Sequence, residues 1–246
     1  MIPDKTEPRI SRINSLITIL TASLIFVLVV IVINMISKML FGTIMASGIR
    51  ARVTVELTGA MLSEIVVLVL LVFYLKRRGM GLRQIGLWAS SPARGWIAAA
   101  IVAGLFMWFN LALPLRNEQN LGEVSLFHIY NALTAGVIAG FVEEIFFRGF
   151  FMTQLAWAGF GKVAQVTISA ILYGLVHSAW GLTSGMFTMQ MIGGAVIGTA
   201  VFGVFSSIVY LVSRRSLMPV IIGHAAIDIV IEPWLFVVAI TMAQAH

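Results

Sequence analysis

The sequence has little of two things on which soluble proteins depend. It contains no cysteine, and only 11% of its 246 residues are charged. Without cysteine there is no disulfide framework, no thiolate nucleophile and no cysteine-ligated metal. The shortage of charge excludes a soluble domain of this length, because such a domain needs far more polar surface to cover its core.

Most of the residues that are present are apolar. Hydrophobic residues make up 60% of the chain, and the mean hydropathy is +1.01. Apolar runs of about 20 residues, the length of a helix that crosses a bilayer, recur along the chain. The first run, 16–36, exceeds the roughly 7–15 residues of a signal-peptide core and lacks a small-residue cleavage site. The sequence therefore predicts an all-α, polytopic transmembrane helix bundle, with residues 1–246 as a single domain in contact with membrane lipid.

The apolar runs place the expected helices. We predict helices at 15–36, 54–75, 95–113, 125–157, 163–180, 188–212 and 217–243. The last segment contains Glu232 and Pro233, and proline inside a helix kinks it or splits it in two. The expected number of helices is therefore seven or eight.

Basic residues in the loops predict the orientation. With the N-terminus inside, the cytoplasmic loops hold Lys5, Arg9, Arg12, Lys76, Arg77, Arg78, Arg83, Arg94, Lys162, Arg214 and Arg215. The opposite loops hold only Lys38, Arg50, Arg52 and Arg116. This asymmetry favours a cytoplasmic N-terminus by the positive-inside rule. The net charge of +6 fits basic loops at an anionic membrane surface better than binding to nucleic acid, which we do not expect.

Several ionisable residues fall inside the apolar runs. Such groups are costly at membrane depth and by default mark function. They are Glu64, Glu143, Glu144, Arg148, His177, His224 and Asp228. Taken singly, the histidines have structural explanations: a bond from His177 to a backbone carbonyl, and an Asp228–His224 hydrogen bond that joins helices. Taken together in a chain with so few charges, these residues predict a functional site.

The stretch "AGFVEEIFFRGF" at 139–150 carries two adjacent glutamates. Glu144 and Arg148 are four residues apart with the acid first, the favourable order for a helical ion pair. Gly136 and Gly140 lie on the same stripe and allow another helix to approach closely. This pattern predicts that Glu144 and Arg148 support a packing interface rather than react directly.

Glu143 has different surroundings on the expected helix. It is rotated by about 100° from Glu144 and has no basic partner on its own helix. Its stripe runs through Ala135 and Ala139, which leave space beside the carboxylate. A carboxylate in a spacious, low-dielectric site is a good general base, so we predict this role for Glu143.

The order of these residues resembles a known family. The pattern is Glu143-Glu144-x-x-x-Arg148, then His177 in "LYGLVHSAWG", then His224-x-x-x-Asp228 in "IIGHAAIDIV". It is similar to the CAAX prenyl protease and bacteriocin-processing family, the intramembrane glutamic proteases also called abortive-infection proteins. The resemblance covers residues 80–232, including "LRQIGL" at 82–87, and marks this region as the expected catalytic core.

The resemblance implies an endopeptidase without a covalent intermediate or a cofactor. It implies that Glu143 and His177 activate a water molecule that attacks the scissile carbonyl. His224 and Asp228 would then stabilise the oxyanion, with Glu144 and Arg148 in support. The substrate would be a membrane-associated peptide or protein, of which a prenylated CAAX tail is the example that the family name suggests.

Two positions depart from the family pattern. The residue four before the histidine is usually Phe, and here it is Tyr173. The last motif often ends in Asn, which Asp228 replaces. An ionised aspartate cannot donate a hydrogen bond to an oxyanion, whereas a protonated one can. Either Asp228 is neutral and donates, which we expect, or it orients His224 and His224 alone donates.

Three other functions use the same residues. Our main expectation is that the protein has no metal site. Glu143, His177 and His224 nevertheless form a chemically possible zinc site, since two histidines and a carboxylate suffice for catalytic zinc. A proton-coupled transporter also uses buried carboxylates and histidines, and Glu64 could extend its relay. In a non-catalytic scaffold the motif would serve packing alone.

Overall fold

The computed structural model describes residues 10–116, 126–184 and 188–244. Every secondary-structure element in these ranges is helical. They are α1 (Arg12–Met45), α2 (Ile49–Arg77), α3 (Ala93–Arg116), α4 (Leu126–Glu143), η1 (Glu144–Phe151), α5 (Met152–Trp157), α6 (Lys162–Ser184), α7 (Met189–Val212) and α8 (Met218–Gln244). Because α4, η1 and α5 follow one another without a break, the bundle has seven helical rods. The all-α prediction is confirmed.

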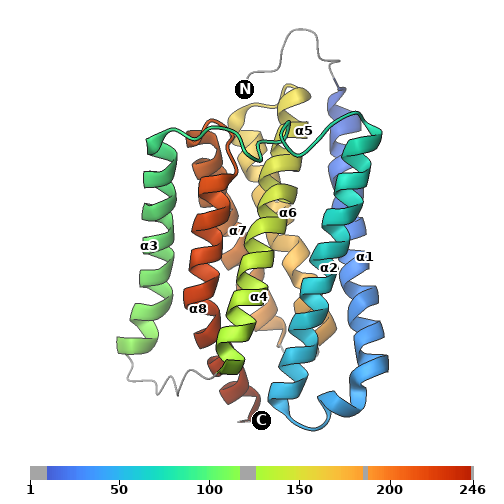
Figure 1. Cartoon of the computed structure of the whole chain (residues 1–246), viewed down its shortest axis with the longest axis vertical. Helices are drawn as coiled ribbons and strands as arrows, with labels where there is room; N and C mark the ends of the chain where they lie inside the picture. Colours follow the sequence, from blue (N-terminus) through green and yellow to red (C-terminus); the bar gives the residue numbers. More distant parts are fainter. Residues whose placement is uncertain (1–9, 117–125, 185–187, 245–246) are drawn as a thin grey trace.

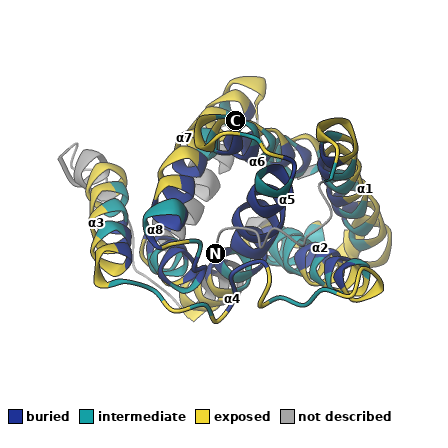
Figure 2. Cartoon of the chain, turned by 90° about the horizontal axis from the view of Figure 1, so that it is seen from above, coloured by how far each residue is buried: buried dark blue, intermediate teal, exposed yellow. Residues whose placement is uncertain are grey.

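Length and composition fit a membrane protein. Five helices (α1, α2, α3, α6 and α7) are long and apolar enough to cross a membrane. The helices run roughly along one direction, and the start of α1 and the end of α8 lie at opposite ends of the bundle (Figure 1). In the view from above, exposed residues face outward from α1, α2, α3 and α7, while buried residues face the interior (Figure 2). An apolar exterior of this kind is stable in lipid.

Neighbouring helices pair closely in three places. The most extensive contacts join α6 to α7, α4 to α8, and α1 to α2. Helix α3 stands at the edge of the bundle and packs against α8 and α7 (Figure 2). The continuous rod of α4, η1 and α5 touches α1, α2, α6, α7 and α8, which places its residues at the centre of the molecule.

Of the two outcomes predicted at Pro233, a kink or a split of the last helix, the split does not occur. α8 continues as one helix through Glu232 and Pro233. A proline removes one backbone hydrogen bond, and the turns on either side carry the helix past it. The other expected segments agree with the structure to within a few residues at most ends, although α1 extends nine residues further than 36, to Met45. Near that end the backbone of Phe41 is non-helical, with φ −118° and ψ 15°.

The loop between α2 and α3 is fixed to the turn between α7 and α8. Gly86 has a φ of +101°, and a Cβ there would lie 2.1 Å from the carbonyl oxygen of Arg215, so only glycine fits. The carbonyl of Gly86 accepts a hydrogen bond from the amide of Leu217 at 3.1 Å. The hydroxyl of Tyr210 donates to the carbonyl of Ile85 at 3.1 Å. The Gly86–Leu217 bond joins the residue before α8, the helix that carries His224, to the loop between α2 and α3.

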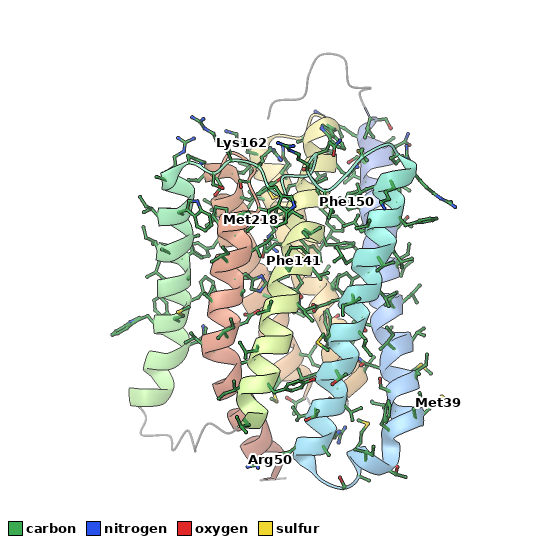
Figure 3. All side chains as sticks on the ribbon, viewed as in Figure 1. Met39, Arg50, Phe141, Phe150, Lys162 and Met218 are labelled. Carbon is green, nitrogen blue, oxygen red and sulfur yellow. The ribbon has the colours of Figure 1, made fainter. Side chains whose placement is uncertain are left out.

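An aromatic core surrounds the central rod. Four phenylalanines of η1 are at most 3% exposed: Phe146, Phe147, Phe150 and Phe151. Phe146 packs edge to face against Phe26 of α1 with ring centroids 5.2 Å apart. Such aromatic contacts contribute about 0.5–1.5 kcal/mol each beyond the burial of their area. In this way η1 is held on several sides, which fixes the polar residues that it carries (Figure 3).

Candidate active site

The two adjacent glutamates lie where the helix changes type. Glu143 is the last residue of α4, and Glu144 is the first residue of the eight-residue π-helix η1. The sequence had predicted an uninterrupted α-helix over 125–157, and the π-helix is a difference that its pattern does not reveal. π-Helices are rare and occur frequently at functional sites. Ser169 of α6 donates to the carbonyl of Phe147 at 2.9 Å, which satisfies a backbone acceptor inside η1.

The glycines upstream bring α8 against α4, as predicted. A Cβ on Gly136 would lie 2.9 Å from the Cβ of Asp228, and a Cβ on Gly140 would lie 2.9 Å from the amide nitrogen of Ala225. Any larger side chain would therefore push α8 away. The small residues on α4 thus set the distance between the glutamates and the polar residues of α8.

The ion pair between Glu144 and Arg148 is confirmed. Nε of Arg148 lies 3.2 Å from Oε2 of Glu144, and both side chains are completely buried. Arg148 also donates to the hydroxyl of Ser206 on α7. Its guanidinium lies over the ring of Tyr173 at 4.4 Å and over that of Phe202 at 5.9 Å. The buried positive charge is thus balanced by one carboxylate and bordered by two aromatic faces.

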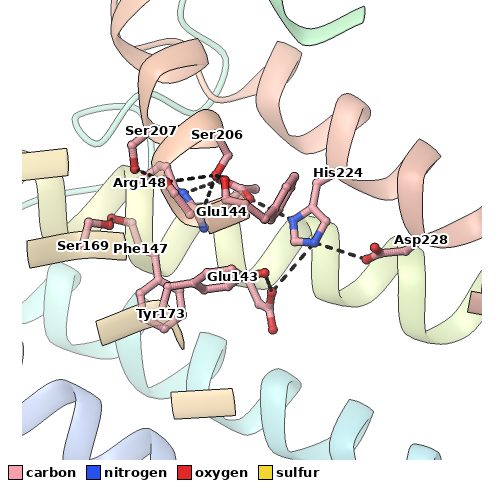
Figure 4. Close-up of polar contacts among 12 residues, drawn as sticks. Glu143, Glu144, Phe147, Arg148, Ser169, Tyr173, Ser206, Ser207, His224 and Asp228 are labelled. Atoms are coloured by element: carbon pink, nitrogen blue, oxygen red, sulfur yellow. Dashed lines mark hydrogen bonds and ion pairs between the residues drawn. The ribbon is translucent and has the colours of Figure 1, made fainter. Parts of the chain in front are cut away.

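Glu144 also has a partner outside this pair. Its Oε1 lies 2.8 Å from Nδ1 of His224. Because Glu144 is paired with a guanidinium and acts as an acceptor, Nδ1 of His224 carries a proton and donates. The sequence indicated packing for Glu144, whereas the structure also places it directly behind His224 (Figure 4).

Carboxylates also surround the other nitrogen of His224. Its Nε2 lies 3.2 Å from Oδ2 of Asp228, the residue one turn further along α8, and 3.9 Å from Oε2 of Glu143. Nδ1 of His224 donates to Glu144. On the other side of the ring, one proton shared between Nε2 and Asp228 provides one hydrogen-bond donor.

The carboxylate of Glu143 is less free than expected. The predicted space beside it is occupied by Tyr173, whose hydroxyl donates to Oε2 at 2.7 Å. Its Oε1 lies 3.4 Å from Nε2 of His177. The side chain is only 4% exposed, so water reaches it through its neighbours rather than from bulk solvent. The absence of a basic partner on its own helix is as predicted.

His177 makes the backbone contact that its structural explanation predicted, and it also faces Glu143. Nδ1 lies 2.8 Å from the backbone carbonyl of Tyr173, one turn earlier on α6. A carbonyl only accepts, so Nδ1 carries the proton and Nε2 points at Glu143. The side chains of His177 and Asp228 are 20% and 18% exposed, against 4–5% for Glu143 and His224. His177 and Asp228 therefore form the accessible edge of the cluster.

The structure brings together six of the seven ionisable residues selected from the sequence. Glu143, Glu144, Arg148, His177, His224 and Asp228 come from α4, η1, α6 and α8 and make one network. Two further members, Tyr173 and Ser206, were not assigned a role from the sequence. Tyr173 stood out only as a departure from the family pattern, and Ser206 gave no signal because hydroxyls are common in apolar helices. Glu64 is buried on α2, which contributes none of these side chains.

The contacts bear on the zinc alternative. Within the described ranges, no group of three or more His, Asp or Glu side chains is arranged to hold a metal ion. Glu143 and His177 face each other, but Nε2 of His224 is closer to Asp228 than to Glu143.

A comparison with known families agrees with the geometry. Residues 124–230 match the family described as type II CAAX prenyl endopeptidase, Rce1-like. This segment is therefore similar to an Rce1-like domain, which confirms the resemblance found in the sequence. No curated protein and no solved structure gives a significant match.

The matched segment contains the whole cluster. It begins two residues before α4 and ends at Val230 of α8, so it spans Glu143 to Asp228. The catalytic core expected from the sequence, 80–232, begins earlier, and its first part stays a prediction. Within the matched segment, the acidic and basic residues of α4 and η1 contact one another and the histidines of α6 and α8.

Proposed function

We propose that this protein is an intramembrane endopeptidase that hydrolyses a peptide bond with water activated by Glu143 and His177. The observation that carries the proposal is the pairing of the Glu143 carboxylate with Nε2 of His177 at 3.4 Å, at the accessible edge of a buried network. The proton on Nδ1 of His177 is held by a backbone carbonyl, so its Nε2 is available to accept. A carboxylate and an imidazole nitrogen aimed at one place can orient and deprotonate a water molecule.

The reaction balances with groups that the site contains. Glu143 takes a proton from water while the water oxygen forms a bond to the scissile carbonyl carbon. The carbonyl oxygen becomes an oxyanion, and the donor on the His224–Asp228 contact stabilises it. Glu143 then returns the proton to the amide nitrogen as the C–N bond breaks. This path involves no covalent enzyme intermediate.

The second glutamate has a supporting role in this mechanism. Glu144 links Arg148 to His224, and both contacts lie in the buried interior. By accepting from Nδ1, it fixes the ring of His224 with Nε2 toward Asp228 and Glu143. Oxyanion donors act well when they are already oriented before reaction, because no reorganisation is needed at that moment.

We propose a membrane-associated peptide or protein as the substrate, with a prenylated CAAX tail as the first to test. The family description names this substrate class. Helices with apolar outer surfaces surround the cluster, so a substrate with an apolar anchor reaches it from the lipid phase. We further propose that the end of the bundle that bears Lys162 faces the cytoplasm, as the loop charges predict (Figure 3).

A cleavage assay on purified protein tests the function. Detergent-solubilised wild-type protein and a Glu143→Gln variant are incubated with a farnesylated CAAX peptide, the same peptide without the lipid, and a mixed peptide library. We expect fragments with the wild-type protein alone, and faster release from the lipidated peptide. Proton-coupled transport or a packing role would give no fragments from any of the three, and that result would reject the proposal.

A further inference from the structure

The hydroxyl of Tyr173 is a polar group that the mechanism above does not use. The ring is 2% exposed, and the hydroxyl donates to Oε2 of Glu143 at 2.7 Å. A charge-assisted hydrogen bond of this kind is stronger than a neutral one. In the family pattern a phenylalanine usually stands at this position, so the hydroxyl is a particular feature of this chain.

Tyr173 contacts both members of the pair that activates water. Its side chain holds one oxygen of Glu143, and its backbone carbonyl lies 2.8 Å from Nδ1 of His177. The carbonyl contact would exist with any residue at this position, whereas the hydroxyl contact requires tyrosine. With Oε2 engaged by the hydroxyl, Oε1 is the oxygen that faces Nε2 of His177.

The ring of Tyr173 also touches the other half of the network. The guanidinium of Arg148 lies 4.4 Å from the ring centroid, and Arg148 is paired with Glu144, which in turn contacts His224. Phe147 packs on the same ring edge to face, with centroids 5.0 Å apart. The ring is therefore fixed by packing, so its hydroxyl is a rigid donor that does not need to be ordered at each turnover.

The geometry points to Tyr173 as a positioning residue for hydrolysis: its hydroxyl locks the Glu143 carboxylate with Oε1 toward His177 and the water. This role rests on the proposed function. Without the hydroxyl, the carboxylate is free to rotate about its last side-chain torsion and toward Nε2 of His224, 3.9 Å away. A misplaced general base lowers the rate of the chemical step, while substrate binding, which does not involve a buried hydroxyl, is unchanged.

The test variant is Tyr173→Phe, which keeps the ring and its contacts with Arg148 and Phe147. We expect kcat to fall by about 10- to 100-fold with KM within about twofold of wild type. Tyr210→Phe is the matched control. Tyr210 is also fully buried, and its hydroxyl donates to the carbonyl of Ile85 and lies near Thr153, outside the site. We expect this control to leave kcat and KM within about twofold of wild type.

A second measurement examines the hydrogen bond without relying on activity. The thermal midpoint is compared for Tyr173→Phe in the wild-type background and in a Glu143→Leu background, which lacks the acceptor. We expect the substitution to lower the midpoint in the first background and not in the second, whereas Tyr210→Phe shifts the midpoint equally in both. Equal shifts by Tyr173→Phe in the two backgrounds would show that the two side chains are not coupled, and would overturn the inference.

The outcomes separate this inference from the proposed function. If the wild-type protein cleaves and Glu143→Gln does not, a Tyr173→Phe variant with unchanged or raised kcat overturns the positioning role alone. A loss in Tyr173→Phe that appears in KM rather than kcat also overturns it. If the wild-type protein cleaves none of the peptides, the proposed function fails, and the positioning role fails with it.

Discussion

Glu143 and Glu144 are neighbours in the sequence, yet they belong to two different parts of the site. Glu144 lies in a buried network. Arg148 balances its charge, and His224 donates a hydrogen bond to its second oxygen. Glu143 faces α6, where Tyr173 and His177 contact its two oxygens and no lysine or arginine pairs with it within the described network. Two identical side chains therefore have different environments, which supports the structural role that we propose for Glu144 and the reactive role that we propose for Glu143.

The site keeps the proposed base, Glu143, apart from the buried charge of Arg148. The only buried arginine of the cluster is committed to Glu144, so it does not neutralise Glu143. The ring of Tyr173 lies between the two halves, with its hydroxyl on one side and the guanidinium of Arg148 over its face. The aromatic ring thus lies between Glu143 and the guanidinium that balances the charge of Glu144.

The largest effect is expected when the proposed base alone is removed. Glu143→Gln keeps the shape of the side chain and should reduce kcat by about 10²–10⁴-fold, because the amide cannot accept the proton from water. The measurement is peptide hydrolysis by purified protein, with size-exclusion behaviour and thermal midpoint as controls for folding. A folded variant that turns over like wild type would remove Glu143 from the mechanism.

Glu144→Gln should instead act mainly on stability. It leaves Arg148 buried without its counterion, and removal of one partner from a buried ion pair costs about 3–5 kcal/mol. We expect a large drop in the thermal midpoint in detergent. Activity should fall as well, because His224 loses its acceptor on Nδ1. Equal stabilities for the Glu144→Gln and Glu143→Gln variants would contradict the assignment of the structural charge to Glu144.

Asp228→Asn is expected to have a smaller effect on activity. The amide supplies a permanent donor of nearly the same shape, so activity should survive. His224→Ala provides the comparison, with an expected loss of roughly 2.7–4 kcal/mol in transition-state stabilisation. A pH–rate profile of Asp228→Asn that lies uniformly well below wild type would show instead that Asp228 orients a charged His224.

Chelation should have no effect. A site that activates water with Glu143 and His177 keeps its activity after exhaustive treatment with a strong chelator. The assay compares treated and untreated protein, with zinc added back to a third sample. Activity that disappears on chelation and returns with zinc would show instead that a bound metal, and not Glu143 with His177, activates the water.

The sequence by itself predicted the membrane fold, most helix positions and the six polar residues of the cluster. This was possible because each depends on local or compositional physics. Apolar runs of bilayer length fold as helices, and an ionisable residue at membrane depth is too costly to occur without a partner. The spacing of Glu144 and Arg148 defined their ion pair for the same reason, since residues four apart share a helix face.

Contacts between distant segments were decided by the tertiary structure alone. No sequence pattern indicated that Glu144 contacts His224, 80 residues away, or that the hydroxyl of Tyr173 donates to Glu143. It also did not predict the π-helix that begins at Glu144, or the uninterrupted passage of α8 through Pro233. These features depend on how closely α4 approaches α6 and α8. That distance is set by the packing of small and aromatic side chains across helices, which no pattern along a single segment records.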